Sequence, residues 1–205
     1  MATSATPYGA RPIGSLSASG SYTGKVRHLP IASTYGTAIF NGDFVTVHTD
    51  GTITKDTGTA ALNSVGIFVG CSYTPSTTSQ KTFNTQWPAS TTATDAMAYV
   101  IDDPHVVFQM QGDEAVNTTD RGLNAGVVQT AGSTAIGKSK NALDASTPAT
   151  TLTLPLRIID FVDGPSSKQP VGTTASDAYP DVVCTFNWPS SVTVSPHQYQ
   201  RATGQ

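Results

Sequence analysis

The stretch that decides the fold is AIFNGDFVTVHTDGTIT, residues 38–54. From Phe44 onward it is rich in β-branched residues, which are stiff at χ1 and favour a pleated strand over a helix. The pair Asp50-Gly51 is typical of a two-residue hairpin turn, because both central residues of a type I′ turn need positive φ. We therefore predict a β-hairpin whose second strand contains residues 52–54.

Strand signals of the same kind follow along the chain. Residues 65–73, VGIFVGCSY, indicate a buried strand whose glycines allow a bulge or a close backbone contact. The run at residues 151–162 is the longest β signal, and Pro155 places it at a sheet edge or a bulge since proline cannot donate to a ladder. Further strands are expected at residues 97–101, 105–110, 127–130 and 181–188, with an Asp-Asp-Pro turn at residues 102–104. Only residues 113–116 and 139–144 could form short helices.

Composition points in the same direction. Thr and Ser make up roughly a quarter of the 205 residues, and the chain has 18 Gly and 13 Pro. We predict an all-β fold, a single β-barrel or β-sandwich domain over residues 31–195 with long Thr/Ser-rich loops. Residues 1–30 contain few large apolar side chains, so we expect an extended N-terminal contact arm that becomes ordered only against a neighbour. Residues 196–205 are expected to be a polar C-terminal tail.

Charge and hydropathy exclude several classes of partner. The net charge is -3 with only 12% charged residues, and no cluster of Lys and Arg forms the basic stripe that direct nucleic-acid binding requires. No run of about 18 apolar residues exists, so we expect no contact with a membrane. The first residues lack the basic start and apolar stretch of a signal peptide, so we expect the chain to be made and assembled in a cytoplasm.

The two cysteines, Cys71 and Cys184, are too few for a disulfide framework and lie far apart in the sequence. Free cysteine is among the most buried residue types, so both are expected to be reduced thiols inside the core.

One motif invites a chemical interpretation. Residues 132–139, GSTAIGKS, match the phosphate-binding pattern GxxxxGK[ST], in which a helix must follow the loop. The segment after Ser139 leaves room for at most two helical turns before Pro148, so we interpret the match as a polar turn. His105 beside Asp102-Asp103 is interpreted as part of a turn as well, because the other histidines are scattered. We therefore expect no cofactor, no metal, no catalytic residue and no enzyme activity.

Five aromatic side chains leave two interpretations open. They could form a platform on which sugars stack, or they could belong to the core or to a subunit interface. These residues are Trp87, Trp188, Tyr73, Tyr99 and Phe83.

Several of these segments together resemble proteins that tailed bacteriophages, particularly short-tailed marine phages, encode beside the major capsid protein. The resemblance lies in IFNGDFV at 39–45, the DGTI turn at 50–53, VGIFVGC at 65–71, YVIDDP at 99–104, LPLRII at 154–159, FNW at 186–188, HQY at 197–199 and TG at 203–204. These stretches are spread over most of the chain from about residue 38 onward.

This resemblance implies a capsid decoration, or cement, protein on the outer surface of the phage head. The expected partners are the major capsid protein and copies of the chain itself, as a dimer or a trimer, with assembly in the host cytoplasm. The N-terminal arm and an excursion at residues 74–94 are the segments that we assign to contact. The candidate capsid-contact residues are Tyr8, Arg11, Tyr22, Arg27, Phe83 and Trp87.

Two other functions stay open at this point. The first alternative is a receptor- or carbohydrate-binding module of a phage head or tail fibre, which would use exposed aromatics. The second is a nucleotide-binding enzyme built on residues 132–139.

Overall fold

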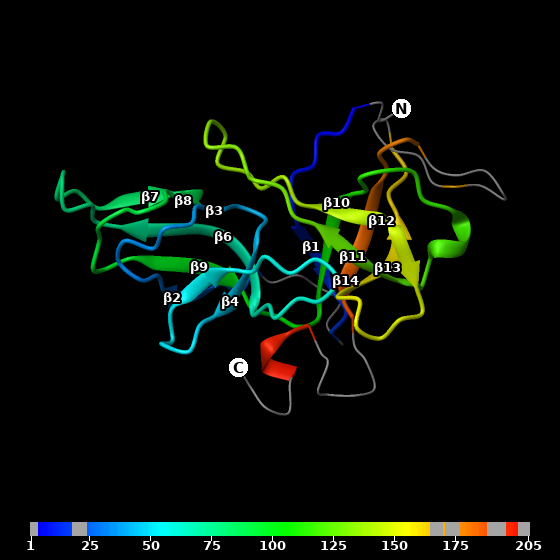
Figure 1. The fold of residues 1–205 in the computed structure, drawn as a ribbon, viewed down its shortest axis with the longest axis horizontal. Coiled ribbons are helices and arrows are strands. Elements are labelled where there is room, and N and C mark those ends of the chain that lie inside the picture. The colour runs from blue at the N-terminus through cyan, green and yellow to red at the C-terminus, as the bar shows by residue number, and fades with distance from the viewer. Residues whose placement is uncertain (1–3, 18–23, 165–169, 171–176, 188–195, 201–205) are drawn as a thin grey trace.

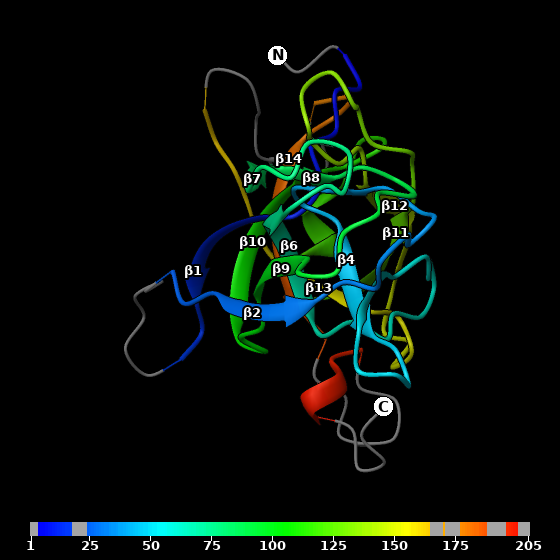
Figure 2. The same ribbon diagram turned by 90° about the vertical axis from the view of Figure 1, so that its left-hand side faces the viewer.

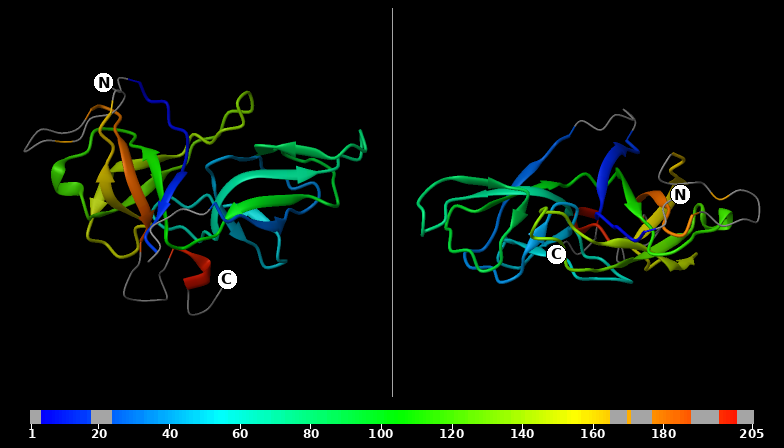
Figure 3. Two further views of the ribbon diagram at one scale, coloured as in Figure 1. Left: turned by 180° about the vertical axis from the view of Figure 1, so that it is seen from behind. Right: turned by 90° about the horizontal axis from the view of Figure 1, so that it is seen from above.

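The computed structural model describes residues 4–17, 24–164, 170, 177–187 and 196–200, and its elements are antiparallel strands with two short 3-10 turns (Figure 1). The all-β prediction is therefore confirmed. The described strands divide between two lobes, which Figure 3 shows from behind and from above as an elongated body. No closed barrel forms among these strands.

Sheet A makes up one lobe and has six strands. Its order is β1-β10-β14-β13-β11-β12. The bounds are β1 Arg11–Ser15, β10 Val106–Gln111, β14 Asp181–Phe186, β13 Leu156–Phe161, β11 Asn124–Val128 and β12 Ala142–Ala149.

Sheet B makes up most of the other lobe, with the order β2-β9-β6-β4-β5, and β7 pairs with the far end of β6. The bounds are β2 Arg27–Pro30, β9 Met97–Ile101, β6 Gly66–Tyr73, β4 Phe44–Val47, β5 Ile53–Lys55 and β7 Thr82–Asn84. A two-stranded ribbon of β3, Ile39–Phe40, and β8, Gln86–Trp87, lies beside it. The 3-10 turns are η1, Thr118–Asp120, and η3, Gln198–Gln200.

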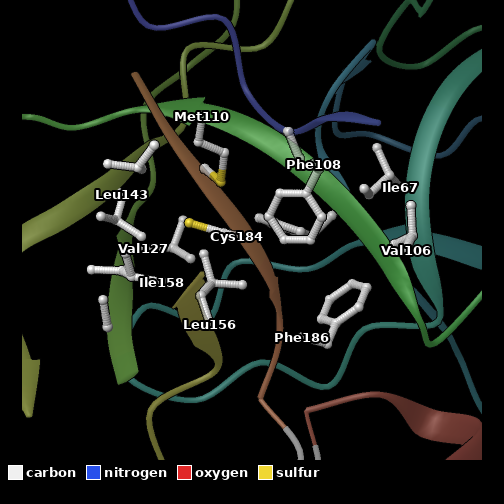
Figure 4. Close-up of a cluster of buried hydrophobic side chains, with 14 of the residues drawn as sticks. Ile67, Val106, Phe108, Met110, Val127, Leu143, Leu156, Ile158, Cys184 and Phe186 are labelled. Atoms are coloured by element: carbon white, nitrogen blue, oxygen red, sulfur yellow. The ribbon is translucent and has the colours of Figure 1, made fainter. Parts of the chain in front are cut away.

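A shared hydrophobic core joins the two lobes. Alternate residues of sheet A point into it, among them Phe108 of β10 and Phe186 of β14, as alternation along a strand requires (Figure 4). Sheet B contributes Phe44, Ile67 and Ile101 to the same cluster. Fully burying one such side chain stabilises a fold by about 1.5–3 kcal/mol. The lobes are therefore parts of one folded unit.

The opposite face of sheet B has its own core. Val45, Phe68 and Val100 point to this side, where they meet Trp87 of the β3–β8 ribbon. Each strand at the middle of sheet B is thus buried on both faces near the contact with sheet A.

The N-terminal segment differs from the expected arm. β1 pairs with β10 at the edge of sheet A, and β2 pairs with β9 at the edge of sheet B (Figure 2). The expectation that residues 1–30 gain order only against a neighbour is therefore wrong for these two strands, because partners within the chain satisfy their backbone groups. Residues 1–3 and 18–23 lie outside the described residues.

The hairpin at residues 44–55 is confirmed, but its turn is of another type. The N–H of Gly51 donates to the carbonyl of His48 at 2.8 Å, and the N–H of His48 donates to the carbonyl of Thr52 at 2.8 Å. Gly51 has a positive φ of 81°, whereas the φ of Asp50 is not positive. This is a turn followed by a left-handed glycine, so only the glycine needs the conformation that other residues avoid.

Three predictions for the second half of the chain were wrong: two short helices and the length of one strand. Residues 139–144 lead into β12, and residues 113–116 have no helix. The strand within residues 151–162 is only β13, while the longest described strands are β6 and β12, with eight residues each. β12 was not predicted, because its sequence ALDASTPA does not alternate apolar and polar residues. This segment is a strand because it pairs with β11.

Candidate contact surface

The most exposed large apolar side chain among the described residues is Phe83 on β7, at 73%. The strand register places Phe83 opposite Ser72 of β6, Ser72 opposite Met97 of β9, and Met97 opposite Pro30 of β2. Directly opposed residues of antiparallel strands share a face. Phe83, Ser72, Met97 and Pro30 therefore form one row across four strands, at the end of sheet B far from sheet A (Figure 1).

A second row lies beside the first on the same face. Tyr99 is two residues from Met97, and it pairs with Gly70 of β6 and with His28 of β2. The rings of His28 and Tyr99 lie 4.6 Å apart. We call these two rows the distal face: its side chains are His28, Pro30, Ser72, Phe83, Met97 and Tyr99.

An exposed ion pair lies at the border of the distal face. Lys81 Nζ is 2.7 Å from Asp95 Oδ2, and Asp95 also accepts hydrogen bonds from the N–H and hydroxyl of Thr74. The hydrogen bonds from Lys81 and Thr74 lower the pKa of Asp95 to about 2. This carboxylate is therefore ionised and already partnered, and it adds no unpaired charge to the face.

Of the six candidate contact residues, Phe83 lies on this face, but Trp87 does not. The Trp87 side chain is 0% exposed, its Nε1 donates to the carbonyl of Tyr35 at 3.2 Å, and its ring meets Tyr73 edge-on at 5.3 Å. The assignment of Trp87 to capsid contact is wrong, because the pairing of β8 with β3 turns its side chain into the core.

Tyr8 and Arg11 lie at the edge of sheet A, away from Phe83. The hydroxyl of Tyr8 donates to Asp181 Oδ1 at 2.9 Å, and burial together with the Asp181 carboxylate raises the pKa of Tyr8 well above its usual range. Arg11 is exposed on β1, opposite Gln109. Tyr22 lies outside the described residues.

Arg27 lies in a polar pocket where the lobes meet. Its Nε pairs with the buried carboxylate of Asp102, and its guanidinium carbon lies 5.8 Å from the centre of the Tyr199 ring. A cavity of about 320 Å³ opens here, lined by Lys25, Arg27, Asp102, Asp103, Pro104 and Tyr199. Sequence reasoning missed Asp102 and Tyr199 as partners of Arg27, because the three come from distant parts of the chain.

The C-terminal segment contributes to this junction and is not a tail up to residue 200. Pro196, His197 and Gln198 are buried. The Gln198 side chain accepts from the N–H of Val47 at 2.8 Å and donates to the carbonyl of Val47 at 3.0 Å, in place of a neighbouring strand. The His197 ring packs edge-on against Phe186 at 5.2 Å, and burial lowers its pKa to about 4. The expected polar tail is therefore wrong for residues 196–198, and residues 201–205 lie outside the described part.

Residues 132–139 form a closed turn, as interpreted from the sequence. The N–H of Ser133 donates to the carbonyl of Lys138 at 2.8 Å, and Gly137, with φ 68°, donates to the carbonyl of Ser133 at 2.8 Å. The chain then enters β12, so no helix N-terminus faces this turn to hold a phosphate.

The turn at residues 102–105 is also confirmed, since the N–H of His105 donates to Asp103 Oδ1 at 2.9 Å. Within the ranges that the structure describes, no group of three or more His, Cys, Asp or Glu side chains could hold a metal ion.

Comparison of the chain with protein-family models, with curated proteins and with solved structures gave no match. Among the described residues, no helix has the length and apolar character to cross a membrane.

Proposed function

We propose that this chain is a non-enzymatic structural protein that decorates a bacteriophage head. In this role it binds the major capsid protein on the outer surface and stabilises the joints between capsid subunits. The sequence resemblance described above suggests the setting, and the observation that carries the proposal is a two-lobed body with one shared core and exposed apolar side chains on both lobes.

The shared core between the two lobes supports a bridging role. Phe44 of sheet B lies 5.8 Å from both Phe108 and Phe186 of sheet A, measured between ring centroids. β1 and β2, which are close in the sequence, also pair with different sheets. A body of this kind transmits force from one lobe to the other, which a clamp across a capsid joint requires.

Exposed apolar side chains on both lobes support contact with other protein surfaces. Sheet B carries Phe83 at 73% and Met97 at 39% exposed, and the sheet A lobe carries Ile13 of β1 at 44% and the adjoining Leu16 at 54%. Clustered exposed apolar residues are typical of interaction sites. Weak contacts at two places on one folded unit reinforce each other on a repeating lattice.

The carbohydrate-binding alternative finds less support. It relies on exposed aromatic rings, but Trp87 and Tyr73 are buried at 0% and 5% exposed. Phe83 and Tyr99 are the remaining described members of the predicted platform, and Trp188 lies outside the described residues.

The test is a binding and heat-stability assay on heads of the encoding phage, purified without this protein. We expect the purified chain to bind expanded heads to saturation and to raise the temperature at which they release DNA. Bovine serum albumin at the same concentration serves as the control for nonspecific adsorption. Heads that neither bind the chain nor gain heat resistance would contradict the proposal, and retention on host surface glycans would favour the alternative.

A further inference from the structure

We propose that the distal face of sheet B is the surface by which this chain docks on the capsid, and that it receives an apolar, weakly charged surface of the major capsid protein. This inference rests on the proposed function and specifies its contact.

The distal face is the uncovered half of a sheet face that is buried elsewhere. Along β6, Ile67 and Val69 point to this face and pack into the core shared with sheet A. Along β9, Ile101 does the same, and Tyr99 and Met97 follow at every second residue. The inner part of this face packs into the core shared with sheet A, whereas Phe83 and Met97 in the outer row are 73% and 39% exposed. The inner part of this sheet face packs against the apolar face of sheet A, so an apolar protein surface is the kind of partner that fits the outer part as well.

The chemistry of the distal face excludes a charged partner as its main occupant. Lys81 and Asp95 at its border pair with each other, so they have little charge to offer a ligand. The side chains within the rows are aromatic, apolar or small and neutral, apart from His28. An apolar protein surface matches this composition, because burying Phe83 and Met97 removes apolar area from water.

The size of the face favours a lattice partner over a free dimer. A stable interface uses about 20–30 residues on each side. The distal face offers six side chains, and one of them, Ser72, is already buried at 5% exposed. A contact this small is weak by itself and gains strength where a capsid presents the same site many times and the other lobe also binds.

The experiment compares head binding by the full chain with that of two double variants. Phe83→Ser with Met97→Ser removes the apolar part of the distal face. Ile136→Ser with Leu152→Ser removes side chains that are 66% and 49% exposed at turns outside this face, and it is the matched control. We expect the distal-face variant to bind heads at least tenfold more weakly and the control to stay within twofold of the wild type. If the double variant folds poorly, Phe83→Ser alone replaces it, because this exposed side chain loses little packing within the fold. We expect the single variant to bind heads more weakly than the wild type as well.

The outcomes separate this inference from the proposed function. If the wild type does not bind heads, the proposed function fails. If the wild type binds and the distal-face variants bind equally well, the function stands and the docking face is wrong. Equal loss in the control variant also overturns the docking face, because the loss of binding is then not specific to the side chains of the distal face. Sedimentation that shows a stable wild-type dimer, dissociated by Phe83→Ser, would assign the face to a second copy instead.

Discussion

The ring of Phe44 on β4 packs edge-on against the ring of Phe186 on β14, with 5.8 Å between their centroids. Phe44 belongs to sheet B and Phe186 to sheet A, and both are 0% exposed. This pair, with Phe108, is the centre of the contact that makes one folded unit of two lobes.

Replacing Phe44 with Ala should destabilise both lobes together. Truncating a buried Phe costs about 3–5 kcal/mol, from lost burial and the cavity left behind. We expect urea unfolding, followed by tryptophan fluorescence and by circular dichroism, to shift to lower urea in one transition. Phe83→Ala is the control, with a change under about 0.5 kcal/mol because its side chain is exposed. Two separate transitions in the wild type would show that the lobes fold independently.

Gln198→Ala should loosen the end of β4. The variant leaves the N–H and the carbonyl of Val47 without the side chain that now binds both, at a cost of about 1–3 kcal/mol. Hydrogen exchange measured by NMR should show faster exchange of the Val47 amide. The exposed Gln80→Ala is the matched control, and unchanged protection of Val47 in the Gln198 variant would refute this role.

Stability should fall as the pH drops below about 6.5, in part because of His197. Burial lowers the folded-state pKa of His197 to about 4 from its ordinary value of 6.5, while the nearby carboxylates of Asp102 and Asp103 oppose the shift. The unfolded chain thus binds the proton more readily, so the stability present above pH 6.5 is lost progressively toward pH 4. By pH 4.5 the expected loss is on the order of 2–3 kcal/mol.

The measurement is the free energy of unfolding at pH 7 and pH 4.5 for the wild type and His197→Gln. The variant should lose less stability between the two pH values, whereas the exposed His48→Gln should lose as much as the wild type. Equal losses in the wild type and the His197 variant would rule out a contribution from His197.

Both cysteines should resist alkylation in the folded protein. Burial raises the pKa of Cys71 to about 12 and raises that of Cys184 further, so neither forms a thiolate at pH 8. Mass spectrometry after iodoacetamide treatment should find no modification in the native protein and two modifications in 6 M guanidinium. Rapid labelling of either thiol under native conditions would contradict this prediction, because it would show that the core around that cysteine opens to solvent.

Local signals predicted much of the strand content. Gly51 and the β-branched run before it led to the correct hairpin, and the Asp-Asp-Pro turn between β9 and β10 was found because its residues shape their own backbone. Trp87 and β12 were not predicted correctly for the opposite reason. Whether Trp87 faces solvent depends on β3, some 50 residues earlier, and β12 is a strand because β11 lies beside it.

The distal face could be predicted only in part. Phe83 was a contact candidate in the sequence because it is an aromatic residue in the excursion at residues 74–94, and alternation along residues 97–101 places Met97 and Tyr99 on one side. That Phe83, Met97 and Pro30 form one row and that Tyr99 and His28 form a second follows from strand register, which the sequence of any single strand does not contain.

The amino-acid sequence by itself determined that this chain is built of strands and turns, because β-branching, glycine and proline act on the φ and ψ angles of their own residues. Only the tertiary structure decided which strands are neighbours, and hence that Trp87 is buried, that Gln198 binds Val47 and that Phe83 is exposed. The physical reason is that burial depends on what packs against a side chain, and in this fold those partners come from remote parts of the chain.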